Sequence, residues 1–166
     1  MSFVVNGETF PAHRAVLAAR SPVFKAQLLG SMADAKMSSI TIPDITSVTF
    51  KAMLRYMYTD ALPADTELGV SSTEVFQDLL VLADRYGIDR LKLMCATKLW
   101  ENVSTETVGA ILVCAETYNC PELKKKCIAF VAKEENLKKT VLTDGFLQLV
   151  QKFPSIVAEM REKFAA

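Results

Sequence analysis

The chain has 166 residues, enough for one domain or one domain with a small extension, and 51% of them are hydrophobic, as in folded globular proteins. Nineteen basic residues balance nineteen acidic ones, so no broad electrostatic field is expected to attract nucleic acid or an anionic membrane. The longest clean apolar run, Ala110 to Ala115, is too short to span a bilayer.

The N-terminal segment predicts a β-hairpin followed by two helices. Residues 3–5 and 8–10 flank the pair Asn6-Gly7, which is the strongest local signal for a tight hairpin. Residues 12–20 are rich in Ala and Leu and predict the first helix. Ser21-Pro22 predicts the start of a second helix, because Ser is a good N-cap and Pro is tolerated in the first turn.

A third strand and a third helix are expected after a polar loop. Residues 40–42 alternate like a strand, and residues 62–72, rich in turn-forming residues, predict a connecting loop. Ser71 and Glu74 form a capping-box pair that predicts the start of the next helix, and every segment from there onwards has a helical pattern. Between strand and loop, apolar residues at helical spacing predict one buried helix face: Phe50, Met53, Leu54, Met57 and Tyr58.

The helical half contains an internal repeat. Residues 80–95 (LVLADRYGIDRLKLMC) and 112–127 (LVCAETYNCPELKKKC) share seven identical positions at an offset of 32 residues. Each copy predicts two helices joined by a turn, at Gly87 or Asn119, and two stacked hairpins would share one apolar seam. Residues 143–164 predict a third helical pair with little identity.

The boundary between the α/β part and the helical tail is expected at residues 102–104. We therefore expect one domain at residues 1–103 and a helical extension at residues 104–166.

No catalytic or cofactor-binding motif is present, so an enzyme is not expected. The chain lacks a phosphate-binding glycine loop, a nucleophile elbow and a paired-carboxylate motif. The single histidine, His13, precedes an Ala/Leu-rich helix and is interpreted as a hydrogen-bonded structural residue.

A metal site is not expected either. The four cysteines lack a Cys-x-x-Cys pair, and the repeat places Cys95 and Cys127 at equivalent buried helix positions. We interpret all four as reduced thiols of a cytosolic or nuclear protein. The basic clusters at residues 124–126 and 138–139 have acidic neighbours and are interpreted as solvated helix faces rather than a nucleic-acid site.

The loop GSMADAKMSS, residues 30–39, keeps two methionines among small and polar residues. Met37, next to the strand at 40–42, is interpreted as filling a gap in the core. Met32 lies two residues from Asp34, a carboxylate that must stay hydrated or paired. Since Met is adaptable and common at binding surfaces, Met32 fits a core position and a docking position equally well from spacing alone.

Several stretches resemble a BTB/POZ domain, most closely that of the speckle-type MATH–BTB family and its plant branch: VVNGETFPAHRAVLAARSPVFKAQL, MADAK, SITIPDI, TFKAMLRYMYTD and LLVLADRYGIDRLKLMC. The resemblance covers residues 2 to about 102, and the tail from Ser104 is similar to the 3-box and BACK-like extension of that family. It implies the α+β BTB/POZ fold, in which a small β-sheet packs on a helical cluster, followed by an all-α helical-hairpin extension.

The resemblance also implies a function. Members of this family recruit cullin-3 to a substrate and so assemble an E3 ubiquitin ligase, without transferring ubiquitin themselves. Their cullin-binding loop carries a hydrophobic–any–acidic motif, which here falls on Met32, Ala33 and Asp34. Met32 is then expected to enter an apolar pocket of the cullin N-terminal region, Asp34 to cap or orient the loop, and Tyr58 to flank the contact. Residues 105–134 would widen this contact as the 3-box.

Further partners follow from the same resemblance. Family members dimerise through a short helix upstream of the first strand, whereas this chain opens at Met1-Ser2, so we expect a homodimer that is weakened or lost. Substrates are expected to bind a MATH domain that these residues do not contain, and the expected location is the nucleus, the cytoplasm or both. The alternative is a BTB self-association module that recruits transcriptional corepressors.

Overall fold

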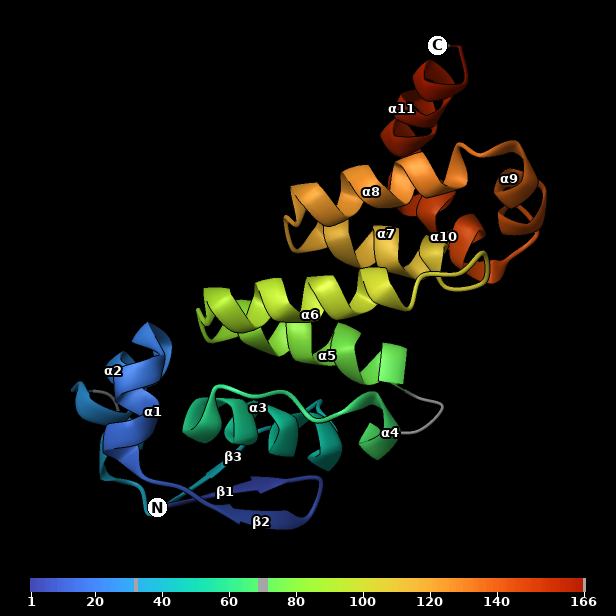
Figure 1. The fold of residues 1–166 in the computed structure, drawn as a ribbon. Helices are drawn as coiled ribbons and strands as arrows, with labels where there is room; N and C mark the ends of the chain where they lie inside the picture. The colour runs from blue at the N-terminus through green and yellow to red at the C-terminus, as the bar shows by residue number, and fades with distance from the viewer. Residues whose placement is uncertain (32, 69–71, 166) are drawn as a thin grey trace. The chain divides into compact units, whose positions relative to one another are not determined.

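The computed structural model describes residues 1–31, 33–68 and 72–165. They separate into two compact units, Met1–Cys95 and Ala96–Ala166 (Figure 1). The first unit holds the sheet and helices α1 to α5, helix α6 runs from the first unit into the second, and α7 to α11 belong to the second. The predicted α+β class is confirmed, because the described residues form one small sheet with its helices and, after β3, helices alone.

The sheet has three strands, β1 (Ser2–Val5), β2 (Glu8–Pro11) and β3 (Ser39–Thr41), in the order β2-β1-β3. The predicted hairpin is confirmed: β1 and β2 are antiparallel, and Asn6 and Gly7 both have positive φ, at 49° and 81°. The third strand joins β1 in parallel. The register pairs Ser2 with Pro11 and Val5 with Glu8 in the antiparallel ladder, and Phe3 with Ile40 in the parallel one.

The helices of the first unit begin where the sequence supplies caps. The hydroxyl of Ser21 accepts a hydrogen bond from the Phe24 N–H at 3.0 Å, which confirms the predicted N-cap of α2. The Thr46 hydroxyl accepts in the same way from the Thr49 N–H at the start of α3. The bounds are α1 (Arg14–Arg20), α2 (Pro22–Leu29), the short 3-10 helix η1 (Ala33–Lys36), α3 (Ser47–Thr59), α4 (Asp65–Leu68), α5 (Ser72–Arg85) and α6 (Asp89–Glu101).

The predicted loop at residues 62–72 is wrong over part of its length, because α4 lies within it. This helical turn is closed locally: the Ala64 N–H donates to the Glu67 carboxylate at 3.2 Å, and the Glu67 N–H donates to the Ala64 carbonyl at 2.9 Å. The Arg55 guanidinium on α3 pairs with Glu67 at 2.7 Å. Ser71, one half of the predicted capping box, lies outside the described residues.

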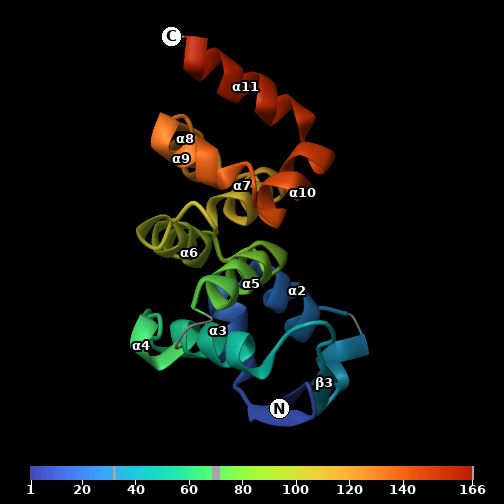
Figure 2. The same ribbon diagram turned by 90° about the vertical axis from the view of Figure 1, so that its right-hand side faces the viewer.

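An aromatic cluster joins the sheet to its helices. Phe3 of β1 packs on Phe24 of α2 and on Phe50 of α3, with ring centroids 5.7 and 5.3 Å apart. Phe24 in turn stacks on Tyr86, 4.1 Å away, at the end of α5. Figures 1 and 2 show α3 lying across one face of the sheet. This cluster therefore joins the central strand to α2, to α3 and to the end of α5.

The buried face of α3 differs in part from the predicted one. Phe50, Met53 and Met57 are buried as predicted, whereas Leu54 is half-buried and Tyr58 is 44% exposed. Tyr56, which the periodicity did not select, is buried at 2% exposure. Helix α3 packs against both the sheet and α5, so its buried arc is wider than one stripe and turned away from Tyr58.

The two copies of the sequence repeat form matching helical hairpins, α5–α6 and α7–α8. Gly87 and Asn119 occupy equivalent turn positions, both with positive φ, at 65° and 53°. In each turn the following amide closes the end of the first helix, as in a Schellman motif. The equivalent bonds run from the Ile88 N–H to the Ala83 carbonyl and from the Cys120 N–H to the Ala115 carbonyl, each at 2.8 Å.

Side-chain contacts repeat as well. Lys92 pairs with Asp84, and the equivalent Lys124 pairs with Glu116, both at 2.8 Å. Cys95 and Cys127 are both fully buried, which confirms the interpretation of these thiols as core residues. The stacking of one hairpin on the other stays a prediction.

The second unit packs α10 closely on α7. A Cβ atom at Gly109 of α7 would lie 2.5 Å from the carbonyl carbon of Gly145 and from the nitrogen of Phe146, so the two backbones touch. The predicted third helical pair is confirmed as α10 and α11. The helices of this unit are α7 (Val108–Thr117), α8 (Pro121–Val131), α9 (Glu134–Thr140), α10 (Asp144–Lys152) and α11 (Pro154–Ala165).

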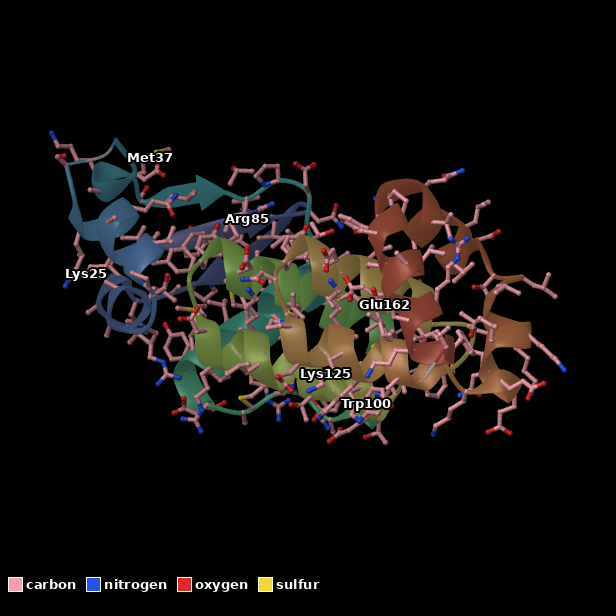
Figure 3. All side chains as sticks on the ribbon, turned by 90° about the horizontal axis from the view of Figure 1, so that it is seen from above. Lys25, Met37, Arg85, Trp100, Lys125 and Glu162 are labelled. Carbon is pink, nitrogen blue, oxygen red and sulfur yellow. The ribbon has the colours of Figure 1, made fainter. Side chains whose placement is uncertain are left out.

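One lysine of the predicted solvated face has a structural role. Lys124 bridges Glu116 of α7 and Glu159 of α11, at 2.8 and 3.0 Å, and its side chain is only 21% exposed. Lys125 and Lys126 are exposed, and Lys126 lies 5.8 Å from the centre of the Trp100 ring. Figure 3 labels the side chains of Trp100, Lys125 and Glu162 in this unit.

Replacing Gly109 with alanine is expected to destabilise the protein. Ala normally favours a helix over Gly by about 1 kcal/mol, but here the added methyl group meets backbone atoms, and overpacking costs about 1–3 kcal/mol. Urea unfolding followed by circular dichroism should show a lower midpoint. Gly145→Ala is the matched control. Its added Cβ would lie 3.0 Å from the nearest atom, so this substitution should lower the free energy of unfolding by less. A gain in stability for Gly109→Ala would contradict the close contact of α7 and α10.

The thiol of Cys127 is expected to be unreactive in the native protein. Burial raises its pKa to about 12, so at pH 8 about one thiol in ten thousand is ionised. Ellman's reagent at pH 8 should leave Cys127 unmodified until urea unfolds the chain. The folded state keeps this thiol protonated at pH values where the unfolded thiol is already ionised. The stability that comes from keeping the thiol neutral is therefore fully present below the pKa of the unfolded thiol and is lost as the pH rises towards 12. Native labelling of Cys127 at the rate of a free thiol would contradict this burial.

Candidate docking site

The residues singled out from the sequence lie in two places in the first unit. Ala33 and Asp34 open η1, in the loop between α2 and β3 (loop 30–38), and Tyr58 lies in the last turn of α3. Met32, the first residue of the predicted motif, lies outside the described residues. The surroundings of loop 30–38 therefore come from its described neighbours.

Loop 30–38 leaves α2 at a crowded glycine. The Gly30 N–H closes the helix by donating to the Ala26 carbonyl at 3.1 Å. A Cβ atom on Gly30 would lie 2.2 Å from that carbonyl oxygen. No other residue fits here without a shift of the backbone, so the direction in which the loop leaves α2 depends on this glycine.

Asp34 is paired within the chain. The Nε2 atom of Gln27 on α2 donates to its carboxylate at 2.6 Å, and the side chain is half-buried. Part of this carboxylate remains accessible, while its hydrogen bond ties η1 to α2. The expectation that Asp34 must be hydrated or paired is consistent with this contact.

Arg14 binds the same loop, and the motif did not include it. Its Nη1 donates to the carbonyls of Leu28 and Asp34, each at 3.3 Å, and its Nη2 donates to the carbonyl of Met37. The sequence carries one signal for this role. Arg14 is the first residue of α1, and a cation at a helix N-terminus opposes the helix dipole, so its guanidinium is expected to find compensation elsewhere.

Tyr58 is held by the residue that precedes Arg14. Its hydroxyl accepts a hydrogen bond from the His13 N–H at 2.9 Å and lies 2.8 Å from His13 Nδ1. The two rings meet edge-on with centroids 5.9 Å apart. His13 is thus a hydrogen-bonded structural residue, as predicted, while Tyr58 as a whole stays 44% exposed.

The end of α3 is fixed by a charged pair. Asp60 is the C-cap in the left-handed conformation, with φ 59°, and its N–H donates to the Tyr56 carbonyl at 2.8 Å. Arg20 forms an ion pair with Asp60 and lies 5.4 Å from the centre of the Tyr56 ring. The hydrogen bond between the side chains of Arg20 and Asp60 lowers the pKa of Asp60 and raises that of Arg20. The backbone that carries Tyr58 is therefore anchored on both sides.

Two family profiles match consecutive parts of the chain. The BTB/POZ domain profile matches residues 1–103, and the profile "BPM/SPOP, BACK domain" matches residues 107–161. The chain belongs to the BTB/POZ family. The resemblance to MATH–BTB proteins is confirmed by this pairing of a BTB domain with a BPM/SPOP-type BACK domain, and by the relatives described next.

Three similar proteins come from Arabidopsis thaliana. BTB/POZ and MATH domain-containing protein 3 is 39% identical over 171 residues and matches 100% of this chain. Proteins 4 and 5 of the same series are 38% and 36% identical and match 99% of it. The chain spans only 42%, 37% and 42% of the lengths of these three relatives. Among solved structures, the BTB domain of human gigaxonin is similar, with 22% sequence identity and a TM-score of 0.47. The match covers 59% of this chain and 75% of the gigaxonin chain.

Within this BTB domain, the interpretation of Met37 as a core residue is wrong. Its side chain is 46% exposed (Figure 3). Two hydrogen bonds hold the main chain of Met37 in this position. Its N–H donates to the Asp34 carbonyl at 3.1 Å, and its carbonyl accepts from Arg14. The core position next to this loop is taken instead by Ile40, which is 6% exposed.

Metal and membrane sites were searched over the same described ranges. Within residues 1–31, 33–68 and 72–165, no three or more His, Cys, Asp or Glu side chains gather in a way that could hold a metal ion. No helix in this part of the chain combines the length and apolar character needed to cross a bilayer.

Removing the hydroxyl of Tyr58 is expected to loosen the end of α3. Tyr58→Phe leaves the His13 N–H without its acceptor, which should cost about 0.5–1.5 kcal/mol of unfolding free energy. Urea unfolding measures this loss. Tyr118→Phe is the matched control, because Tyr118 is half-exposed and none of the described residues forms a hydrogen bond with its hydroxyl. Equal effects of the two substitutions would show that the contact with His13 contributes nothing to stability.

Proposed function

We propose that this chain is the BTB–BACK part of a non-catalytic adaptor that recruits cullin-3 to form an E3 ubiquitin ligase, leading to substrate ubiquitination. The observation that carries the proposal is the pairing of the BTB match at residues 1–103 with the BPM/SPOP-type BACK match at residues 107–161. MATH–BTB proteins with this pairing are, in general terms, cullin-3 substrate adaptors.

The docking contact is proposed to use Met32, Ala33 and Asp34 together with Tyr58. Met32 would enter an apolar pocket of the cullin N-terminal region, a burial worth about 1.5–3 kcal/mol for a complete side chain. Support for Asp34 as the orienting residue comes from its hydrogen bond to Gln27, which ties the motif to α2. Support for Tyr58 as a flanking contact comes from its exposed ring on an anchored helix end.

Further parts of the assembly are proposed from the family. The hairpin at residues 105–134 would widen the cullin contact as the 3-box. Substrates would be held by a MATH domain. The names of the three Arabidopsis relatives include such a domain. The adaptor would act in the nucleus, the cytoplasm or both, and ubiquitin transfer would be performed by the cullin–RING partners.

Met32→Ala is expected to weaken cullin binding. Truncating a hot-spot side chain costs about 2 kcal/mol or more, which is a roughly thirtyfold increase in Kd. Isothermal titration calorimetry of the purified chain against the cullin-3 N-terminal region measures it. Met37→Ala is the matched control, since it removes an exposed methionine from the same loop but outside the motif and should leave Kd nearly unchanged.

Two outcomes would contradict the proposal. Equal affinities of the wild type and Met32→Ala would remove the docking role of this side chain. A wild-type chain that forms a stable dimer by light scattering and binds no cullin would instead favour the self-association module.

A further inference from the structure

We propose that Arg14 is a positioning residue of the docking site: its guanidinium clamps loop 30–38, at Asp34 and Met37, to the end of α2. The consequence for binding rests on the proposed cullin function. The clamp itself is a property of the free chain and can be measured without a partner.

The clamp joins three points of the backbone. Nη1 reaches the carbonyl of Leu28 in the last turn of α2 and that of Asp34 in η1, each at 3.3 Å, and Nη2 reaches the carbonyl of Met37, the residue directly after η1. All three acceptors are main-chain atoms, so the contact holds these three points of the backbone whatever side chains the loop carries.

The carbonyl at the end of α2 explains why a cation lies here. The last carbonyls of a helix have no partner within it and carry the negative end of its dipole. Leu28 offers such a carbonyl, and the Arg14 guanidinium fills the role that basic side chains often take at a helix C-terminus. The unfavourable place of Arg14 at the start of α1 is thus offset at the end of α2.

The same stretch of chain also holds the second half of the site. His13, directly before Arg14, binds the Tyr58 hydroxyl through its N–H and its ring. Consecutive Cα atoms are about 3.8 Å apart across one peptide unit, so loop 30–38 and Tyr58 are both anchored to neighbouring residues. A site organised in this way loses less conformational freedom on binding, which favours affinity.

Lysine is not equivalent to arginine at this position. The guanidinium presents donors on separate nitrogens in a rigid fork, whereas an ammonium is a single point of charge. Arg14→Lys therefore keeps the charge and the helix propensity but cannot serve three separated carbonyls as well. Arg14→Gln removes the charge in addition and provides a second variant.

The first measurement is amide exchange in the free chain. In the Arg14→Lys variant the Met37 amide, which donates to the Asp34 carbonyl, should exchange faster by about fivefold or more, as expected for the loss of one net hydrogen bond. Arg55→Lys is the matched control, because it alters an arginine of the same unit whose carboxylate partner, Glu67, lies away from loop 30–38. Met37 exchange should be unchanged in it.

The second measurement is a double-mutant cycle on cullin binding. Arg14→Lys should raise Kd by about threefold to tenfold in the wild-type background. The increase should be smaller when Met32 is already alanine, because a loop without its inserted side chain gains less from being positioned. A residue that only supports the fold would lower affinity equally in both backgrounds.

Each outcome of these two measurements supports or overturns a defined part of the proposal. Unchanged Met37 exchange in Arg14→Lys and Arg14→Gln overturns the clamp. Faster exchange with an unchanged Kd, or with additive losses, overturns its role in positioning the site. Should the wild-type chain bind no cullin, the proposed function fails, while the exchange measurement still accepts or rejects the clamp.

Discussion

The packing of the Phe3 ring is the contact on which the first unit depends. Phe3 lies in the central strand of the sheet and touches both Phe24 of α2 and Phe50 of α3. These two helices carry the two halves of the candidate site, one at the end of α2 and one at the end of α3. One buried side chain thus contacts both helices that lead to the two halves of the site, which are far apart in sequence.

Around this core, the candidate site is held mainly by contacts to the backbone. Arg14 binds three carbonyls, and the His13 N–H binds the Tyr58 hydroxyl. Tyr58 and part of the half-buried Asp34 remain at the surface, while other residues hold the backbone that carries them. This separation of positioning from contact suits an adaptor, whose function is to present a preformed surface rather than to carry out a reaction.

The helical half of the chain applies the same local chemistry twice, once in the α5–α6 hairpin and once in the α7–α8 hairpin. The turns at Gly87 and Asn119 have the same backbone sign and the same closing hydrogen bond, and the ion pairs of Lys92 and Lys124 are equivalent. Asn can replace Gly here because it tolerates the left-handed region better than other residues with a side chain. The repeat is therefore a repeat of physical constraints as well as of letters.

The sequence by itself determined the features that depend on neighbouring residues: the Asn6-Gly7 hairpin, the Ser21 cap and the paired helical turns. It also determined the family, because the motif residues are contiguous. Only the tertiary structure decided that Tyr56 rather than Tyr58 is buried, that Met37 faces outwards, and that Arg14 reaches loop 30–38. Periodicity describes one element in isolation, whereas these outcomes depend on which element packs against it and on hydrogen bonds that join residues about twenty or more positions apart.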